Sequence, residues 1–204
     1  MVHTKDGSLC VREFLVWGSA KDRKQILKVL KPHLERIWTN EEGQLVLFTA
    51  LDVIECVSPC YSRTTLKRTS ASSDTKLLTK SLLTDLSTTS FTPKIYSEIT
   101  GRRALLYPLV HRSPRHFTPA LILSVASTDP IREKTSKKDE GVRRDEVRRA
   151  VSDGYLAAVV GDVEAMISDP GGSLVFGEVM LFAEGGMETF TSYTHTHEAN
   201  NDRR

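Results

Sequence analysis

DGSLCVREFL at residues 6–15 returns near the other end of the chain as GGSLVFGEVM at residues 171–180. Two weaker echoes lie between them, EGQLVLF at residues 42–48 and TGRRALLY at residues 100–107. Each copy places a glycine just ahead of an apolar run with helical character. Self-similarity of this kind indicates structural units that stack on one another, and it directs the search for function toward an extended surface rather than a pocket.

The spacing of these glycines fits repeats built from pairs of helices. Gly7 and Gly43 stand 36 residues apart, and Gly101 and Gly172 stand 71 apart, about two such periods. The step from Gly43 to Gly101 is 58 residues, but it falls to 40 when residues 56–73, which break the helical pattern, are set aside. Periods of about 34 to 47 residues are typical of helix-pair repeats. We therefore predict an all-α fold, a helical-repeat solenoid.

Hydrophobic periodicity predicts the individual helices. The clearest covers residues 20–38, where apolar residues at spacings of three and four share one stripe and Pro32 should kink or split the helix. Others are expected at residues 8–17, 42–54, 74–84, 102–111, 117–127, 139–160 and 172–184. The sequence thus divides into repeats at residues 1–54, a disordered Ser/Thr-rich insert at 55–73, a second helical region at 74–184 and a disordered tail at 185–204.

Composition and charge limit the possible functions. Hydrophobic residues make up 39% of the 204 residues, which is enough for a packed core. No apolar run reaches the roughly 18 to 20 residues that a membrane span needs, so no membrane partner is expected. Three cysteines are too few for a disulfide framework and favour a reducing, intracellular compartment. Residues 1–149 carry 26 basic and 17 acidic side chains, whereas residues 161–204 carry two and eight, so a basic working surface precedes an acidic end.

Motifs of catalysis and metal binding are missing from the sequence. It contains no phosphate-binding P-loop, no H-E-x-x-H and no nucleophile elbow. Cys56 and Cys60 stand four apart without a second ligand pair, and His195 and His197 lie in the tail, so neither pair predicts a metal site. We therefore expect no enzyme activity, no metal and no cofactor.

Several long, ordered phrases resemble the Puf (Pumilio-homology) family, and most closely its nucleolar Puf-A/penguin branch, whose members end in a CPL region. They are MVHTKDGS at residues 1–8, VREFL at 11–15, AKDRK at 20–24, ILKVLKPH at 26–33, QLVLFTALDVI at 44–54, GRRALLY at 101–107, RHFTP at 115–119, KTSKKD at 134–139 and DPGGSLV at 169–175. The resemblance implies Puf/ARM-like repeats at 1–54 and the CPL helical-repeat region at 74–184. Because family members are longer and carry more repeats upstream, it also implies a C-terminal portion.

The resemblance further implies where nucleic acid would lie, because in Puf repeats the second helix of each repeat meets the bases. The corresponding positions here are Ser8, Leu9 and Arg12; Gln44, Leu45 and Phe48; Arg102, Arg103 and Leu106; and Ser173, Leu174 and Gly177. Only the Ser8/Arg12 and Arg102/Arg103 pairs suit nucleic acid, since leucine cannot stack as an aromatic ring or guanidinium does. We therefore expect no base-by-base code, in keeping with a branch thought to bind RNA or DNA through basic surface.

Basic clusters favour such binding, because lysine and arginine neutralise phosphates regardless of sequence. The candidate RNA-binding residues are Ser8, Arg12, Lys21, Arg23, Lys24, Lys28, Arg102, Arg103, Arg112 and Arg115. A group at Lys134, Lys137 and Lys138 is a further possibility. The arginines between residues 143 and 149 alternate with acids, so ion pairs within a helix are at least as plausible there. The simplest alternative for every cluster is a solvated helix face.

The leading hypothesis is an RNA-binding helical-repeat module with low sequence specificity, in a nucleolar ribosome-biogenesis or translational-regulation factor of the nucleus. Its partners would be RNA, including structured or double-stranded RNA, and pre-ribosomal proteins. The alternative is a HEAT-like protein-interaction scaffold without direct RNA contact, and a third possibility is a truncated product with little function of its own. One continuous basic face would favour RNA, and scattered basic residues would favour the scaffold.

Overall fold

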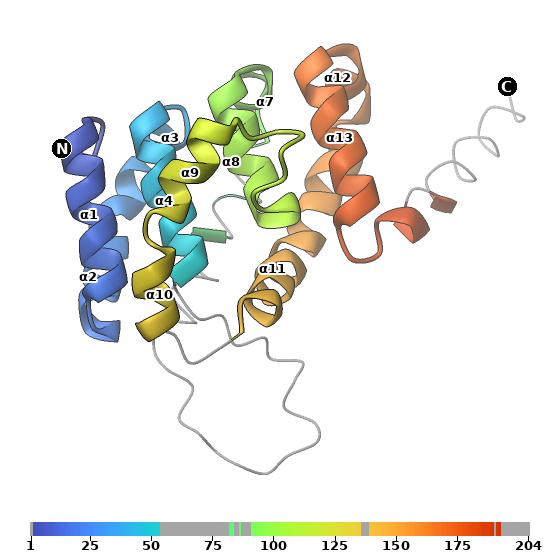
Figure 1. The fold of residues 1–204 in the computed structure, drawn as a ribbon. Coiled ribbons are helices and arrows are strands. Elements are labelled where there is room, and N and C mark those ends of the chain that lie inside the picture. Colours follow the sequence, from blue (N-terminus) through green and yellow to red (C-terminus); the bar gives the residue numbers. More distant parts are fainter. Residues whose placement is uncertain are drawn as a thin grey trace, which may run out of the picture.

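A computed structural model describes residues 2–53, 82–83, 86, 91–135, 139–189 and 191–192. Within these ranges every regular element is a helix, and strands are absent (Figure 1). The expected insert at 55–73, most of the helix expected at 74–84 and most of the expected tail lie outside the described residues. None of the described helices is long and apolar enough to cross a membrane.

The first part of the chain folds into α1 (Lys5–Trp17), α2 (Ala20–Leu30), the 3-10 turn η1 (Lys31–His33), α3 (Leu34–Trp38) and α4 (Glu41–Val53). Ser19 and Asp22 start α2 with reciprocal bonds to each other's backbone N–H, a capping box. Pro32 lies inside η1 and divides the helix expected at residues 20–38, because its ring cannot continue an α-helical hydrogen-bond ladder.

The second part contains α7 (Pro93–Ser97), α8 (Ile99–Val110), α9 (Pro119–Ala126), α10 (Asp129–Thr135), α11 (Glu140–Gly161), α12 (Val163–Ser168) and α13 (Pro170–Phe182). Helices α7, α10 and α12 were not among those expected from the sequence. Each has only five to seven residues, too few turns for a hydrophobic period to be recognised.

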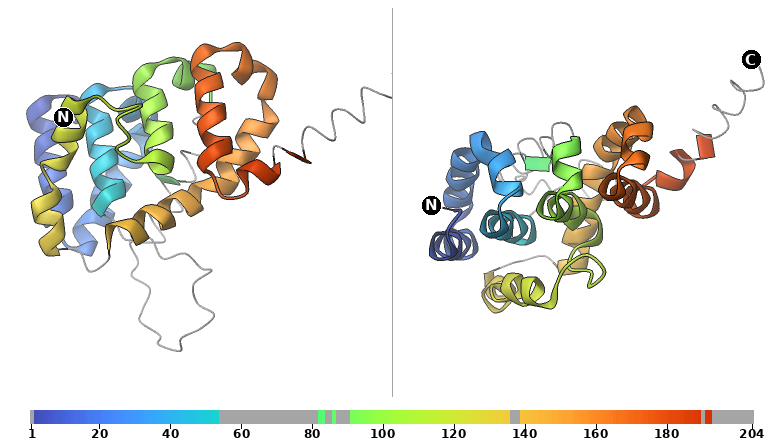
Figure 2. Two further views of the ribbon diagram at one scale, coloured as in Figure 1. Left: turned by 45° about the vertical axis from the view of Figure 1, so that its right-hand side comes forward. Right: turned by 90° about the horizontal axis from the view of Figure 1, so that it is seen from above.

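Helices α1, α4, α8 and α13 stand side by side and form an inner row (Figures 1 and 2). Each of α4, α8 and α13 follows a short outer helix, respectively α3, α7 and α12, against which it packs. The repeated phrase of the sequence is therefore the start of an inner helix. The structure confirms the predicted all-α stack of helix pairs.

The recurring glycine marks the contact between the outer and inner helix of a pair. A Cβ on Gly43 would lie 2.7 Å from the carbonyl oxygen of Ile37, and one on Gly172 would lie 2.5 Å from that of Met166. Gly101 stands in the same relation to Ile95, also six residues earlier. These glycines are needed because the backbone of the outer helix approaches too closely for a side chain.

Residues 111–135 form a covering segment that lies across the inner row (Figure 2, right). It consists of an irregular stretch followed by α9 and α10, which pack on α4 and α1. The ring of Phe117 meets Phe48 and Tyr107 edge-on, at centroid distances of 5.8 and 5.6 Å, and those two rings stack on each other at 4.1 Å. The covering segment is thus joined to the core of the stack by an aromatic cluster.

Candidate nucleic-acid interface

The inner-row positions that the resemblance assigns to base contact are largely buried. Ser8, Gln44, Phe48 and Leu106 expose 1% or less of their surface. The hydroxyl of Ser8 donates to the carbonyl of Glu42 at 2.8 Å, which joins α1 to α4. The prediction that Ser8 contacts RNA is therefore not supported by its position, because the hydroxyl is used inside the stack.

Arg12 is also an internal residue, with 3% of its surface exposed. Its Nε donates to Thr49 Oγ1 at 3.0 Å, and its Nη2 donates to the carbonyl of Ser124 and, at 3.2 Å, to Ser127 Oγ. Burial lowers the pKa of this guanidinium. Arg12 thus connects α1, α4 and the covering segment. No local sequence pattern indicates this role of Arg12, because its partner Ser124 lies 112 residues away.

Arg112 belongs to a buried polar cluster rather than to a surface. Its Nη2 lies 2.7 Å from Asp52 Oδ2 and 2.8 Å from Asp129 Oδ1, and its Nη1 lies 2.5 Å from Asp129 Oδ2. Asp52 also accepts from the Tyr107 hydroxyl at 2.7 Å, and its Oδ1 lies 3.0 Å from His111 Nε2. The guanidinium that was predicted to bind phosphate is therefore paired with two carboxylates, those of Asp52 and Asp129.

The titration behaviour of this cluster follows from burial and pairing. Burial alone would raise the pKa of Asp52, but its bonds to His111, Arg112 and Tyr107 outweigh that effect and lower it. Burial raises the pKa of Tyr107 well above its usual value and lowers that of His111. At neutral pH the cluster therefore holds an ionised Asp52 opposite a charged Arg112, with His111 neutral.

Arg102 and Arg103 point at different neighbours and form no common surface. The Nη1 of Arg102 donates to the carbonyl of Ser97 at 2.8 Å, at the end of α7, and Arg103 Nε donates to the carbonyl of His116 at 3.3 Å. Both side chains are half-buried. They stabilise the turn before α8 and the covering segment, so the predicted pair is only partly available to a ligand.

Arg115 is the most exposed of the predicted arginines, at 70% of its side chain, and lies 3.1 Å from Glu178 Oε1. Glu178 is buried in α13, and His116 Nε2 approaches the same oxygen at 3.1 Å. Together with Arg12, Phe117 and Arg103, these contacts bring the covering segment onto all four inner helices. The covering segment therefore lies over much of the inner row, while Leu9, Ser173 and Leu174 remain exposed among the positions that correspond to base contacts.

The arginines of α11 are paired, as the alternative interpretation expected. Arg144 pairs with Glu140, Arg148 lies 2.8 Å from Asp145, and Arg149 lies 2.9 Å from Glu184. Arg143 is buried and donates to the carbonyl of Asp52 at 2.7 Å. Lys134 is exposed on α10, while Lys137 and Lys138 lie outside the described residues.

A polar cleft of about 440 Å³ lies beside these residues, between α8, α11 and α13. Tyr107, Arg115, Arg144, Arg148 and Glu178 are among the residues that line it. Its arginines are balanced by carboxylates, so it is not an evident phosphate site. The part of the chain that the structure describes contains no cluster of three or more potential metal ligands.

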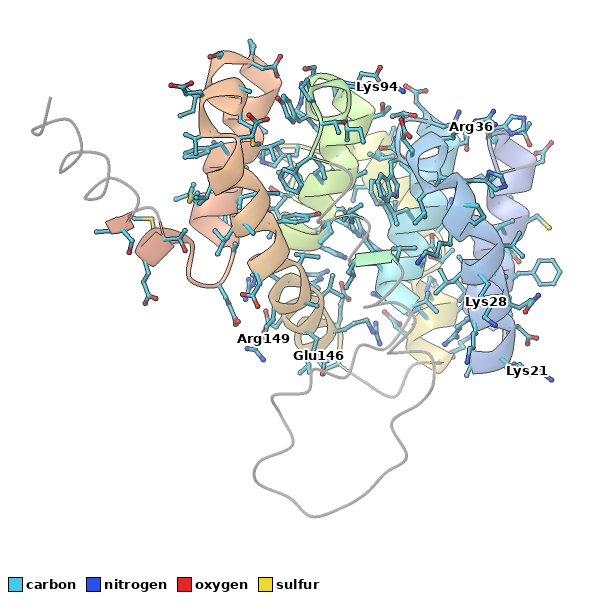
Figure 3. All side chains as sticks on the ribbon, turned by 180° about the vertical axis from the view of Figure 1, so that it is seen from behind. Lys21, Lys28, Arg36, Lys94, Glu146 and Arg149 are labelled. Atoms are coloured by element: carbon cyan, nitrogen blue, oxygen red, sulfur yellow. The ribbon has the colours of Figure 1, made fainter. Side chains whose placement is uncertain are left out.

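Helix α2 carries the remaining predicted residues. Lys21 and Lys28 are exposed and Lys24 is half-exposed. Arg23 instead donates to the carbonyls of Leu15 at 2.8 Å and Val16 at 3.1 Å, which satisfies the last turn of α1. The exposed lysines therefore lie on the outer side of the stack, away from the inner row (Figure 3).

Comparison with known proteins agrees with this fold. The CPL (NUC119) domain model matches residues 97–201. The chain is 28% identical over 188 residues to Pumilio homolog 3 of Mus musculus, covering 92% of this chain and 26% of that protein. It is 30% identical over 185 residues to Pumilio homology domain family member 6 of Schizosaccharomyces pombe, covering 89% of this chain and 25% of that protein. The chain thus spans about a quarter of these relatives.

A solved structure extends the likeness to three dimensions. The crystal structure of human Puf-A in complex with DNA matches 89% of this chain and 32% of that one, with a TM-score of 0.71 and 27% sequence identity. The matching family model covers more than half of this chain, and the relatives are Pumilio-homology proteins. The chain therefore belongs to the Pumilio-homology (Puf) family, in the branch that carries a CPL (NUC119) domain.

Proposed function

We propose that this chain is an RNA-binding helical-repeat module that holds the phosphate backbone with little regard to sequence. The observation that carries the proposal is the likeness, over 89% of the chain, to a Puf-A protein crystallised with DNA. The basic excess of residues 1–149 supports it, because such a field attracts polyanions. The module acts by binding and not by catalysis.

Low specificity follows from the largely covered inner row. Base reading needs side chains that reach exposed base edges or rings, and Ser8, Gln44 and Phe48 are buried here. Leu9 and Leu174 remain exposed, but a leucine side chain cannot hydrogen-bond a base edge, so binding falls to charged side chains, which contact phosphates and carry no sequence information. The resemblance to the Puf-A/penguin branch extends the proposal to a factor of ribosome biogenesis or translational regulation in the nucleolus, with pre-ribosomal proteins as further partners.

Equilibrium binding to short RNAs tests the proposal. A hairpin and two unrelated single strands would be titrated at about 50 and 200 mM salt, by fluorescence anisotropy. We expect binding to each RNA, a steep fall with salt and less than about fivefold difference between the two single strands, since backbone contacts release counterions. Failure of folded protein to bind any of them at the lower salt would overturn the function.

A protein-interaction scaffold is the second candidate, and an exposed apolar surface favours it. A shallow hollow on α1 is lined by the exposed side chains of Leu9, Phe14 and Trp17. Asp6 and Glu13 also line it. Exposed apolar clusters with a polar rim are typical of protein contacts. On this alternative Trp17→Ser would abolish co-purification with a pre-ribosomal protein while RNA stays unbound, whereas on the leading proposal it leaves RNA affinity unchanged.

A further inference from the structure

The exposed basic residues of the first repeats share the outer side of the stack. We define the outer basic face as Lys21, Lys24, Lys28, Lys31 and Arg36, from α2, η1 and α3. Figure 3 views the molecule from this side and shows Lys21 and Lys28 along α2, with Arg36 toward the opposite end. Four of these side chains are exposed, and that of Lys24 is half-exposed.

The lysines of this face form one stripe along the helix. Lys21, Lys24, Lys28 and Lys31 are spaced by three, four and three residues, which keeps them within one side of a helix with 3.6 residues per turn. Leu27 and Leu30 lie on the buried side of the helix. At about 1.5 Å per residue the stripe is roughly 15 Å long. That length spans about four to five phosphates of one duplex strand.

Few acids oppose this charge. The segment of residues 20–38 contains six basic residues and two acids, Asp22 and Glu35. Asp22 accepts hydrogen bonds from the backbone and hydroxyl of Ser19, and Glu35 lies 3.1 Å from Lys94 of α7. The second pair offsets one of the two acidic charges.

We propose that the outer basic face, and not the inner row, holds RNA in this chain, and that it holds the backbone of a base-paired segment. The proposal rests on the function proposed above and assigns its surface. Residues 111–135 cover much of the inner row, whereas Lys21, Lys28 and Arg36 are exposed on the outer side. These exposed side chains are cations, which contact phosphates. A duplex offers more phosphates per length than a single strand, so it gains most from such a surface.

The test compares two charge-matched variants of the full 204-residue chain. Lys21→Gln/Lys28→Gln removes two charges from the outer basic face. Lys5→Gln/Lys134→Gln removes two exposed lysines from α1 and α10. Each protein would be titrated with an RNA hairpin, with the corresponding DNA duplex and with an unpaired RNA of the same length, over a range of salt. Thermal unfolding by circular dichroism would verify that both variants are folded.

We expect the outer-face variant to lose on the order of tenfold in affinity for the hairpin, and the slope of log K against log salt to become shallower by about two, one unit for each phosphate contact. The control should stay within about twofold, and the unpaired RNA should bind more weakly than the hairpin. The DNA duplex should lose affinity in parallel, because only phosphates are contacted.

Three different results would overturn the proposal. Equal affinities of the outer-face variant and the control, with the wild type binding RNA, would reject this surface and leave the proposed function standing. No binding by folded wild-type protein would reject the function, and the surface with it. Preference for the unpaired RNA would reject a base-paired segment as the ligand of this surface.

Discussion

The guanidinium of Arg112 and the carboxylate of Asp129 face each other through two parallel bonds, with Nη1 2.5 Å from Oδ2 and Nη2 2.8 Å from Oδ1. This pair joins the two ends of the covering segment to each other, and Nη2 also reaches Asp52 on α4 of the inner row. The covering segment is therefore anchored to the inner row by a mostly buried ion-pair cluster as well as by apolar contacts.

Removing Arg112 should destabilise the fold strongly. In Arg112→Gln the buried carboxylate of Asp52 loses its cation, and breaking one partner of a buried pair costs about 3 to 5 kcal/mol. Urea denaturation of the variant and the wild type would measure the loss. Arg148→Gln is the control, because Arg148 and its partner Asp145 are 37% and 59% exposed, so that this change should alter stability by less than about 1 kcal/mol. Equal effects would contradict the anchoring role.

Substitution of the recurring glycine should separate close contacts from ordinary helix positions. Gly43→Ala places a Cβ 2.7 Å from a backbone oxygen that cannot move freely, so we expect a loss of about 1 to 3 kcal/mol. Gly177 in α13 has no atom within 4 Å of such a Cβ, so Gly177→Ala should stabilise by about 0.5 to 1 kcal/mol. Melting temperatures that shift in the same direction would refute this account of the repeats.

Acidification should weaken the fold through His111 before it affects Asp52. The pKa of His111 is lowered by burial, so on falling pH the unfolded state, with a pKa of about 6.5, binds the proton first. The free energy of unfolding should therefore decrease as pH drops below about 6.5. The facing charged or titratable groups are Asp52, Tyr107, Arg112 and Arg144. The lowered pKa of Asp52 adds a further loss only near and below its unfolded value of about 3.9.

Urea titrations between pH 7.5 and 5 check this sign. His111→Asn should flatten the pH dependence in that range, because its amide does not titrate and asparagine tolerates the positive φ of 52° better than most residues. A slope that survives in His111→Asn would place the titrating group elsewhere.

The sequence predicted the stack because its signals are local. The glycine phrase, the apolar stripe of α2 and the break at Pro32 all concern residues within a few turns of one another. The covering segment was not predictable in this way. Arg12 reaches Ser124 across 112 residues, and Arg112 reaches Asp52 across 60, and a solitary sequence contains no pattern for such contacts. For the same reason, arginines that were assigned to RNA by composition proved to be internal. The exposed lysines of α2 were identified because amphipathic spacing alone determines which side faces water.

Two variants with opposite expected effects on stability and RNA affinity would distinguish the internal arginines from the surface lysines. In Arg12→Met the buried hydroxyl of Thr49 loses a donor, and a buried group left unsatisfied costs about 1 to 3 kcal/mol. We expect lower stability but, at a temperature where the variant is folded, RNA affinity within about twofold of the wild type. Lys21→Gln/Lys28→Gln should behave in the opposite way, with unchanged stability and weaker binding. Denaturation curves and anisotropy titrations on the same samples give both quantities. A tenfold loss of RNA affinity in folded Arg12→Met would show that the inner row opens to admit the ligand, because a residue sealed between α1, α4 and α9 has no other route to a phosphate.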